Sequence, residues 1–162
     1  MQNNIQLTPH FELREFTESA TARKHGIVNE PPAEAVENLK ALCFHTLEPL
    51  REAMGLPIII NSGYRCKALN ELLLHHARKS QHMSGCAADF YVKGADLRRE
   101  LLIKAFRTII LDERIAFDQL IIYPSFIHVS YVRNGKNRGK LTKAYGNGTY
   151  CALSRAEALA LS

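Results

Sequence analysis

Two short segments of the chain carry the residue types of a catalytic metal site. They are residues 80–90 (SQHMSGCAADF) and residues 126–131 (FIHVSY). Together they offer His82, Asp89 and His128, and two imidazoles with one carboxylate suit catalytic zinc, which keeps a fourth position open for water. Spacing alone would be weak evidence, because most such His/Asp pairs are an exposed histidine and a surface or capping aspartate.

The elements that position these side chains are expected to be neighbouring strands. Residues 87–92 alternate so that Asp89 faces away from the apolar side chains. Residues 126–132 alternate so that His128 shares a face with Phe126. A turn at 123–125 would join this strand to residues 117–122 and place Ile121 opposite His128. A metal could therefore be clamped between two strands.

The letters around these residues resemble a known signature. The segment SQHMSGCAADF is similar to the S-x-H-x-x-G-x-A-x-D pattern of the zinc D-Ala-D-Ala carboxypeptidase family of peptidoglycan peptidases, whose fold is shared with the Hedgehog signalling domain. FIHVSY resembles the family's strand with the third ligand, and residues 61–66 (NSGYRC) resemble its substrate-arginine turn. The likeness runs from about Phe11 to Tyr131.

This resemblance implies roles for individual residues. Arg65 follows a predicted core strand and is expected to bind the carboxylate of the substrate peptide, a task that suits a planar guanidinium. Without the resemblance it would be interpreted as a surface or ion-pairing arginine. Ser80 and Gln81 are candidates to line the site, with structural polar roles as the alternative. The expected ligands of one zinc ion are His82, Asp89 and His128.

The pattern does not supply a catalytic base. Zinc lowers the pKa of its water towards ~7, but a carboxylate is expected to accept the proton. Many relatives have an acidic residue three positions before the last histidine, and others have a glutamate near the end of the preceding strand. Those places hold Ser125 and about Tyr123 here. Asp118 could be the base, although strand alternation points it away from His128; Glu113 could approach from elsewhere; or catalysis has been lost.

Hydrophobic periodicity predicts a single α+β domain over residues 1–162, with its core in about 11–132. Helices are expected over 13–24, 33–54 (kinked at Pro49), 66–76 and about 96–111, and a buried strand over 57–61. The resemblance implies the Hedgehog/DD-peptidase fold, an antiparallel sheet with helices packed on it and zinc on one face. Residues 133–162 are expected to be a loop-rich tail in which 154–161 can form a short helix.

Histidine and cysteine residues outside the signature receive no metal role. Ser130 and Tyr131 are instead candidates to hydrogen-bond the ligand imidazoles. Adjacent His75 and His76 would point about 100° apart on a helix, so they are expected at the surface. No C-x-x-C pair is present, and the spacing gives no framework for two disulfides. Free buried thiols are therefore expected at the four cysteines, Cys43, Cys66, Cys86 and Cys151.

Composition narrows the function classes. The 162 residues are 46% hydrophobic and 23% charged, as in ordinary soluble proteins. The formal charge is +5, and the basic run from Arg133 to Lys143 reads as a solvated loop or as an attraction to an anionic polymer such as the cell wall. No nucleic-acid motif is present, and no run approaches the roughly 18–20 apolar residues of a membrane span. A monomer is expected.

The start of the chain lacks the basic and apolar regions of a secretory signal. The protein is therefore expected to be made in the cytoplasm and released to the wall by another factor, as in a phage lysin. The favoured hypothesis is a zinc-dependent hydrolase of peptidoglycan stem peptides, a carboxypeptidase or endopeptidase. The alternatives are a zinc-containing wall-binding module without turnover, and a metal-free domain whose polar groups only hydrogen-bond.

Overall fold

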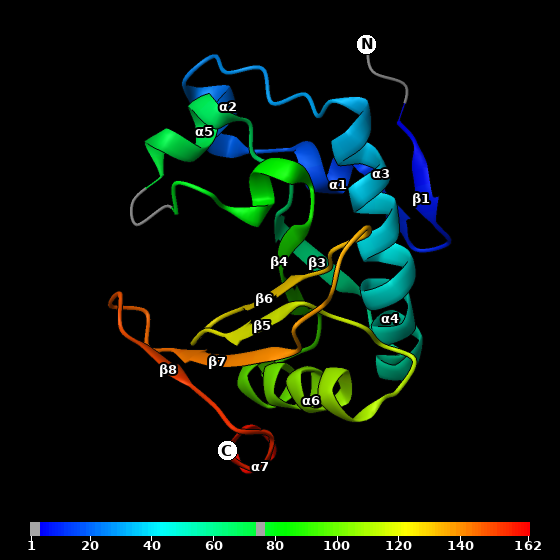
Figure 1. Ribbon diagram of the computed structural model, residues 1–162, viewed down its shortest axis with the longest axis vertical. Helices are drawn as coiled ribbons and strands as arrows, with labels where there is room; N and C mark the ends of the chain where they lie inside the picture. Colours follow the sequence, from blue (N-terminus) through cyan, green and yellow to red (C-terminus); the bar gives the residue numbers. More distant parts are fainter. Residues whose placement is uncertain (1–3, 74–76) are drawn as a thin grey trace.

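A six-stranded sheet organises the molecule. The computed structural model describes residues 4–73 and 77–162, and Figure 1 shows its layout. The strands lie in the order β3-β4-β6-β5-β7-β8. Their bounds are β3 Ile58–Ser62, β4 Ala87–Val92, β5 Gln119–Ile122, β6 Ile127–Ser130, β7 Lys140–Ala144 and β8 Tyr150–Ala152.

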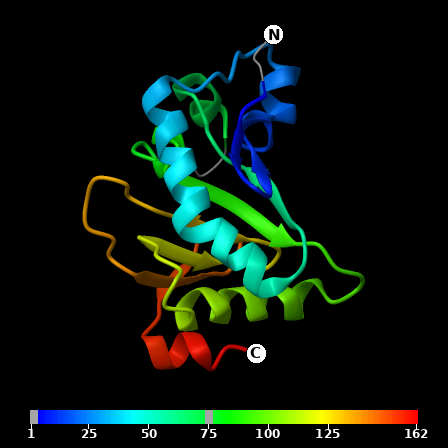
Figure 2. The ribbon, with the colours of Figure 1, turned by 90° about the vertical axis from the view of Figure 1, so that its right-hand side faces the viewer.

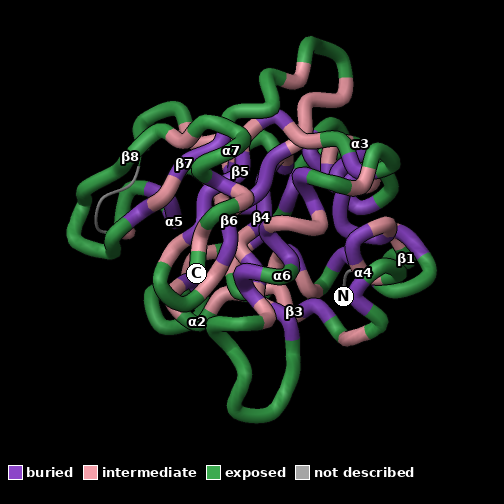
Figure 3. Tube along the Cα trace, turned by 90° about the horizontal axis from the view of Figure 1, so that it is seen from below, coloured by how far each residue is buried: buried purple, intermediate pink, exposed green. Residues whose placement is uncertain are grey.

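The longest helices cover one face of this sheet, whereas α2 (Ala20–Lys24) and α5 (Lys67–Leu72) lie away from it (Figure 1). Figure 2 shows α3 (Ala33–Leu42) and α4 (Glu48–Met54) as one column against the sheet, with α6 (Arg98–Leu111) below it. A small ribbon of β1 (Gln6–Thr8) and β2 (Phe11–Glu12) precedes the short helix α1 (Leu13–Thr17). Figure 3 shows that β4, β5 and β6 are mostly buried at the centre, whereas the loops are exposed. The largest fully buried side chains include Phe16, Leu39, Phe90, Phe106 and Leu120.

Two predicted helices are interrupted for identifiable reasons. Residues 13–24 form α1 and α2 (Ala20–Lys24) rather than one helix, because Ser19 is extended and its side chain accepts a hydrogen bond from Ala22 N. Between α3 and α4 the chain makes a π-helical turn, Cys43–Leu47. Pro49 lacks the N–H that would bond to the His45 carbonyl, and that carbonyl accepts from Ala116 N at 3.0 Å instead.

Strand pairing places the chemistry-bearing residues in one row across the sheet. Asp89 on β4 pairs with His128 on β6, and His128 pairs with Ile121 on β5, which confirms the predicted register of that hairpin. Ile121 pairs in turn with Thr142 on β7, in a parallel arrangement. The sheet is therefore mixed, and the prediction of a purely antiparallel sheet is wrong at β5–β7.

The prediction that residues 133–162 are a tail outside the core is also wrong, although more than half of the segment is loop. This segment adds β7 and β8 to the sheet, and its apolar residues Leu141, Ala144 and Ala158 are buried. The expected short terminal helix is present as α7 (Arg155–Leu159), opened by a capping box at Ser154. The strands escaped notice because β7 reads KLTKA, and β-propensity depends strongly on the neighbours a strand finds.

Two smaller differences concern the region before the signature. The predicted buried strand is an edge strand, β3, in which Ile58 alone is fully buried. The predicted helix 66–76 is present as α5 over Lys67–Leu72, and His75 and His76 lie outside the described residues. In the described part of the chain, none of the helices has the length and apolar character to cross a membrane. All four cysteines are free, as predicted, but only Cys43 is buried, so the prediction of buried thiols is wrong for the other three.

Candidate metal centre

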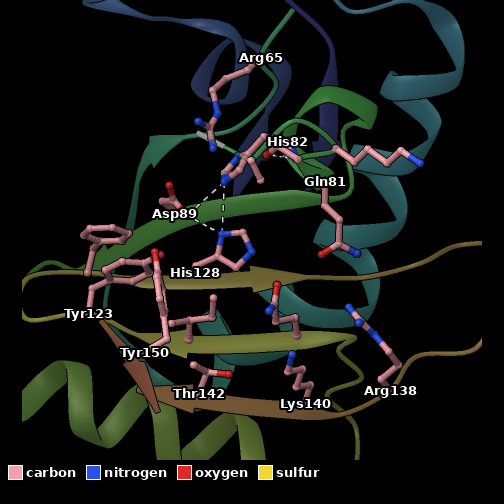
Figure 4. A pocket seen from close by; sticks show the side chains of 16 residues that line it. Arg65, Gln81, His82, Asp89, Tyr123, His128, Arg138, Lys140, Thr142 and Tyr150 are labelled. Carbon is pink, nitrogen blue, oxygen red and sulfur yellow. Dashed lines mark hydrogen bonds and ion pairs between the residues drawn. The ribbon is translucent and has the colours of Figure 1, made fainter. Parts of the chain in front are cut away.

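Three side chains meet at the open face of the sheet. The Nδ1 atom of His128 lies 2.8 Å from Oδ1 of Asp89 and 3.2 Å from Nε2 of His82, and Nε2 of His82 lies 3.3 Å from the same Asp89 oxygen. Figure 4 shows all three pointing toward one another. Ligands at 2.0–2.1 Å in tetrahedral geometry would be separated by about 3.3 Å. The donor types and their spacing therefore fit one zinc ion.

A short 3₁₀ turn, η2 (Gln81–Ser84), carries His82 to this position. Ser80 begins the turn by accepting a hydrogen bond from His82 N at 3.3 Å, and Gly85 ends it with φ +74°. A Cβ at Gly85 would lie 2.4 Å from the carbonyl oxygen of Ala35 on α3. The glycine of the signature is therefore needed for backbone conformation and for close packing on a helix, both of which hold the turn in place.

Backbone contacts fix the orientation of the His82 ring. The ring is 1% exposed, and its Nδ1 lies 2.7 Å from the carbonyl oxygen of Gly63. That carbonyl can only accept, so Nδ1 carries a proton and Nε2 presents its lone pair to the cluster. Burial lowers the pKa of His82, despite the opposing effect of Asp89, and so favours the neutral form that a metal ligand needs.

The predicted hydrogen-bond partners of the imidazoles have other roles. Ser130 accepts from Gln119 N at 3.1 Å, and Tyr131 stacks on His45 with ring centroids 4.6 Å apart. The carbonyl of Gly63 takes the place expected for Ser130 or Tyr131 at His82. Sequence reasoning missed it because a backbone acceptor leaves no residue-type signal.

Asp89 supplies the negative charge of the cluster. Burial raises its pKa, but the neighbouring imidazoles, chiefly His82, outweigh burial and hold the pKa of Asp89 well below its usual range. The carboxylate is therefore ionised at neutral pH. Its negative charge, next to the ring nitrogens of His82 and His128, can help to balance a divalent cation.

The cluster opens into a cavity of about 790 Å³. One wall is aromatic and contains Tyr123, whose ring stacks on Phe126 with centroids 4.3 Å apart. The opposite wall is polar and basic, and Figure 4 shows both walls around the cluster. The other labelled residues that line the cavity are Arg65, Gln81, Arg138, Lys140, Thr142 and Tyr150.

Arg65 lies at one end of the cavity, beside the cluster. Its backbone N–H donates to the carbonyl oxygen of His82 at 3.1 Å, which ties the Arg65 turn to η2. Its side-chain Nε is buried without a hydrogen-bond partner among the described residues. Burial lowers the pKa of Arg65, although the Asp89 charge opposes this. Arg65 lines the cavity, and a guanidinium at that place is suited to an anionic ligand group.

Asp118, the candidate base, is engaged elsewhere. Arg138 binds both of its oxygens, at 3.0 and 2.7 Å, and Nε2 of Gln81 donates to it at 2.9 Å. These contacts, led by the Arg138 hydrogen bonds, lower the pKa of Asp118 to about 2. Asp118 does not line the cavity. It positions Gln81, which does, and an ion-paired carboxylate of such low pKa is a poor proton acceptor.

The second candidate base is also distant from the cluster. Glu113 is exposed in the turn between α6 and β5 and does not line the cavity. Among the described residues that line the cavity, Asp89 is the only carboxylate. Cys86, which lies inside the signature, does not belong to the metal-binding group.

Several cavity residues lay outside the sequence-based prediction. Lys140 and Thr142 come from β7, and Tyr150 comes from β8. The only available signal was the basic run 133–143, which reads equally well as a solvated loop. The strand register of β7, which no local pattern reveals, is what turns Lys140 and Thr142 toward the cavity.

Comparisons with known proteins agree with this geometry. No curated protein matches the chain. The family described as peptidase M15 matches residues 9–130, which include Arg65 and all three members of the cluster. Because this match spans more than half of the sequence, the chain belongs to the peptidase M15 family, the zinc D-Ala-D-Ala carboxypeptidase family of metallopeptidases.

Proposed function

We propose that the protein is a zinc peptidase that hydrolyses a peptide bond in the stem peptides of peptidoglycan, as a carboxypeptidase or endopeptidase. The supporting observation is the compact group of His82, Asp89 and His128 at the floor of a cavity whose end is marked by the unpaired guanidinium nitrogen of Arg65. Peptidases of the M15 family are zinc-dependent, and the donor set of this cluster fits that ion.

The residues of the site have different roles in the proposed hydrolysis. His82, Asp89 and His128 would hold the ion, which when bound supplies an acidified water and polarises a carbonyl. Arg65 binds the substrate carboxylate and thereby fixes the peptide along the cavity. Gln81 is held through its Nε2 by Asp118, which leaves Oε1 to accept a hydrogen bond from a water or an amide of the substrate.

The test combines metal analysis with product analysis. Protein purified without chelators is expected to contain one equivalent of zinc and to shorten purified muropeptides, as measured by mass spectrometry. His82→Ala should remove both properties. His25→Ala is the matched control, because His25 is exposed at the end of α2, away from the cavity. Zinc-loaded protein that leaves every muropeptide intact would reject the enzyme proposal.

A second candidate function is a zinc-containing module that binds the wall without turnover. The observation that favours it is the lack of any described cavity-lining carboxylate other than Asp89, which is itself a predicted ligand. Binding to purified sacculi in a pull-down, with no release of peptides and with loss of binding in Arg65→Gln, would support this function. Release of peptides that depends on His82 would exclude it.

A further inference from the structure

A quarter of the residues that line the cavity, four of sixteen, lie beyond the family match. The match ends at residue 130, whereas Arg138, Lys140, Thr142 and Tyr150 follow it. The cluster and Arg65 belong to the matched part. The wall formed by 138–150 is therefore the part of the cavity in which this chain can differ from other members of the family in what it recognises.

Register fixes how this wall lies relative to the cluster. His128, Ile121 and Thr142 are successive partners on β6, β5 and β7. Adjacent strands lie about 4.8 Å apart, so Thr142 lies roughly 10 Å from His128 across the sheet. Figure 4 shows Arg65 on one side of the cluster and Thr142 on the other. A ligand that contacts Arg65 and the cluster would thus continue across β5 toward β7.

Thr142 carries the observation that points to a ligand. Its side chain is 6% exposed, it lines the cavity, and its Oγ1 has no hydrogen-bond partner among the described residues. A buried hydroxyl without a partner costs about 1–3 kcal/mol. Arg65 Nε at the opposite end has the same property. Two orphaned polar atoms at opposite ends of one cavity indicate an elongated polar ligand.

The positive charge of Lys140 beside Thr142 indicates that the ligand carries a negative charge there. Arg138 is committed to Asp118. Lys140 is exposed, lines the cavity and takes part in none of the ion pairs found among residues 4–73 and 77–162. It stands opposite Gln119, one side-chain repeat along the strands from the Ile121–Thr142 pair. This uncommitted ammonium therefore faces the same stretch of the cavity as the Thr142 hydroxyl.

We infer that β7 binds the substrate on the N-terminal side of the cleaved bond and selects peptides with a free carboxylate two or three residues before that bond. The inference rests on the proposed function, in which Arg65 holds the C-terminal carboxylate. An extended peptide advances about 3.3 Å per residue, so the roughly 10 Å to Thr142 corresponds to about three residues. Thr142 bonds the peptide backbone there, and Lys140 pairs with the carboxylate.

Two synthetic stem pentapeptides test this selectivity. They end in D-Ala-D-Ala and differ only at the γ-linked glutamate in the second position, which carries either its free α-carboxylate or the α-carboxamide. For the wild-type protein KM is expected to be about three- to ten-fold lower for the carboxylate peptide, the range for a partly exposed charged hydrogen bond. Lys140→Gln should abolish this preference.

Lys136→Gln is the matched control, because Lys136 is exposed in the same segment but does not line the cavity. It should retain the preference. Thr142→Val keeps the β-branched shape and should raise KM for both peptides by about five-fold, with a smaller change in kcat. Equal preference in Lys140→Gln and Lys136→Gln, or an unchanged KM in Thr142→Val, would overturn the inference.

Titration calorimetry with the same peptides separates this inference from the proposed function. If the wild-type protein cleaves neither peptide but binds the carboxylate form more tightly, and Lys140→Gln loses that difference in Kd, the inference stands and hydrolysis fails. If both peptides are cleaved without distinction, hydrolysis stands and the inference fails. Equal Kd values with no cleavage reject both.

Discussion

Two of the aspartates with lowered pKa values, Asp89 and Asp118, contact residues of η2, and their surroundings differ in one decisive respect. Asp89 has two imidazoles as partners, His82 and His128. Asp118 has the guanidinium of Arg138, which binds it through two nitrogens and remains protonated at any relevant pH. Asp118 is thus already neutralised by a permanent cation, whereas Asp89 lies between two imidazoles whose ring nitrogens could bind the same metal ion.

This difference indicates which of the two carboxylates can bind a metal ion: Asp89 rather than Asp118. Both aspartates are reached from η2, because neighbouring residues of that turn point in different directions: His82 toward Asp89 and Gln81 toward Asp118. One short turn therefore joins a candidate metal site to a structural ion pair. Four substitutions can break or sharpen the contrast.

The largest expected effect is the loss of zinc in Asp89→Asn. Loss of groups that merely support metal ligands costs 10–100-fold in affinity, so removal of a ligand charge should weaken zinc binding by about 100-fold or more. Asp118→Asn should bind zinc as the wild-type protein does. Competition with a chromogenic chelator measures both affinities. Equal weakening in the two variants would contradict the contrast.

The next effect concerns the turn that serves both aspartates. Gly85→Ala places a Cβ on a residue with φ +74° and within 2.4 Å of the Ala35 carbonyl oxygen. The left-handed conformation alone costs about 1–2 kcal/mol, and displacement of α3 adds to it. Urea unfolding should therefore show a loss of about 2 kcal/mol or more. Gly26→Ala, with a similar φ of +63° and open space around it, is the control and should lose less.

A smaller effect, with a defined pH window, is expected for Asp118→Asn. Replacing an ionised acceptor of Arg138 should cost about 1–3 kcal/mol at pH 7. The pKa of Asp118 is lowered from 3.8 to about 2, so its ionised form stabilises the fold above pH 4. That stabilisation is lost as the pH falls from about 4 to about 2. The difference in unfolding free energy between wild type and variant should shrink over this range; a constant difference would contradict the ion-pair role.

The smallest effect is expected for Ser80→Ala, which removes the side-chain acceptor at the start of η2. An N-cap replacement of this kind costs about 1 kcal/mol. Because the 3.3 Å hydrogen bond to His82 N is long, the loss should be at the lower end of the usual range. Thermal unfolding measures it. Ser19→Ala, at the start of α2, provides the comparison far from both aspartates.

The sequence predicted the cluster because the letters around its residues resemble a family signature, whereas their spacing alone was weak evidence. His82, Asp89 and His128 stand in alternating strand patterns or beside small residues, and the structure brings these three residues together. That they bind zinc stays a prediction. Asp118 shows the limit of such reasoning: strand alternation already pointed it away from His128, but its ion pair with Arg138, twenty positions later, is a contact that no spacing reveals.

The helices and strands that could be predicted are those whose own residues form an apolar pattern or a local cap. The hairpin of β5 and β6 has buried β-branched residues, and α6 has a clear apolar stripe. In contrast, β7 is a strand because β5 supplies its hydrogen bonds, and its own residues, KLTKA, give no reason to expect one. Likewise, the π-helical turn before Pro49 depends on a distant residue: the N–H of Ala116 donates to the His45 carbonyl oxygen, which has no N–H donor at Pro49.

The position of β7 in the sheet also bears on how this protein can be cut or recombined. A fragment that stops at residue 130 would end in the middle of the six-stranded sheet. It would bare the edge of β5, a short run in which Leu120, Ile121 and Ile122 are all buried. Flat apolar edges pair with one another and aggregate. Chimeras and minimal versions of this enzyme family member should therefore retain the chain through α7.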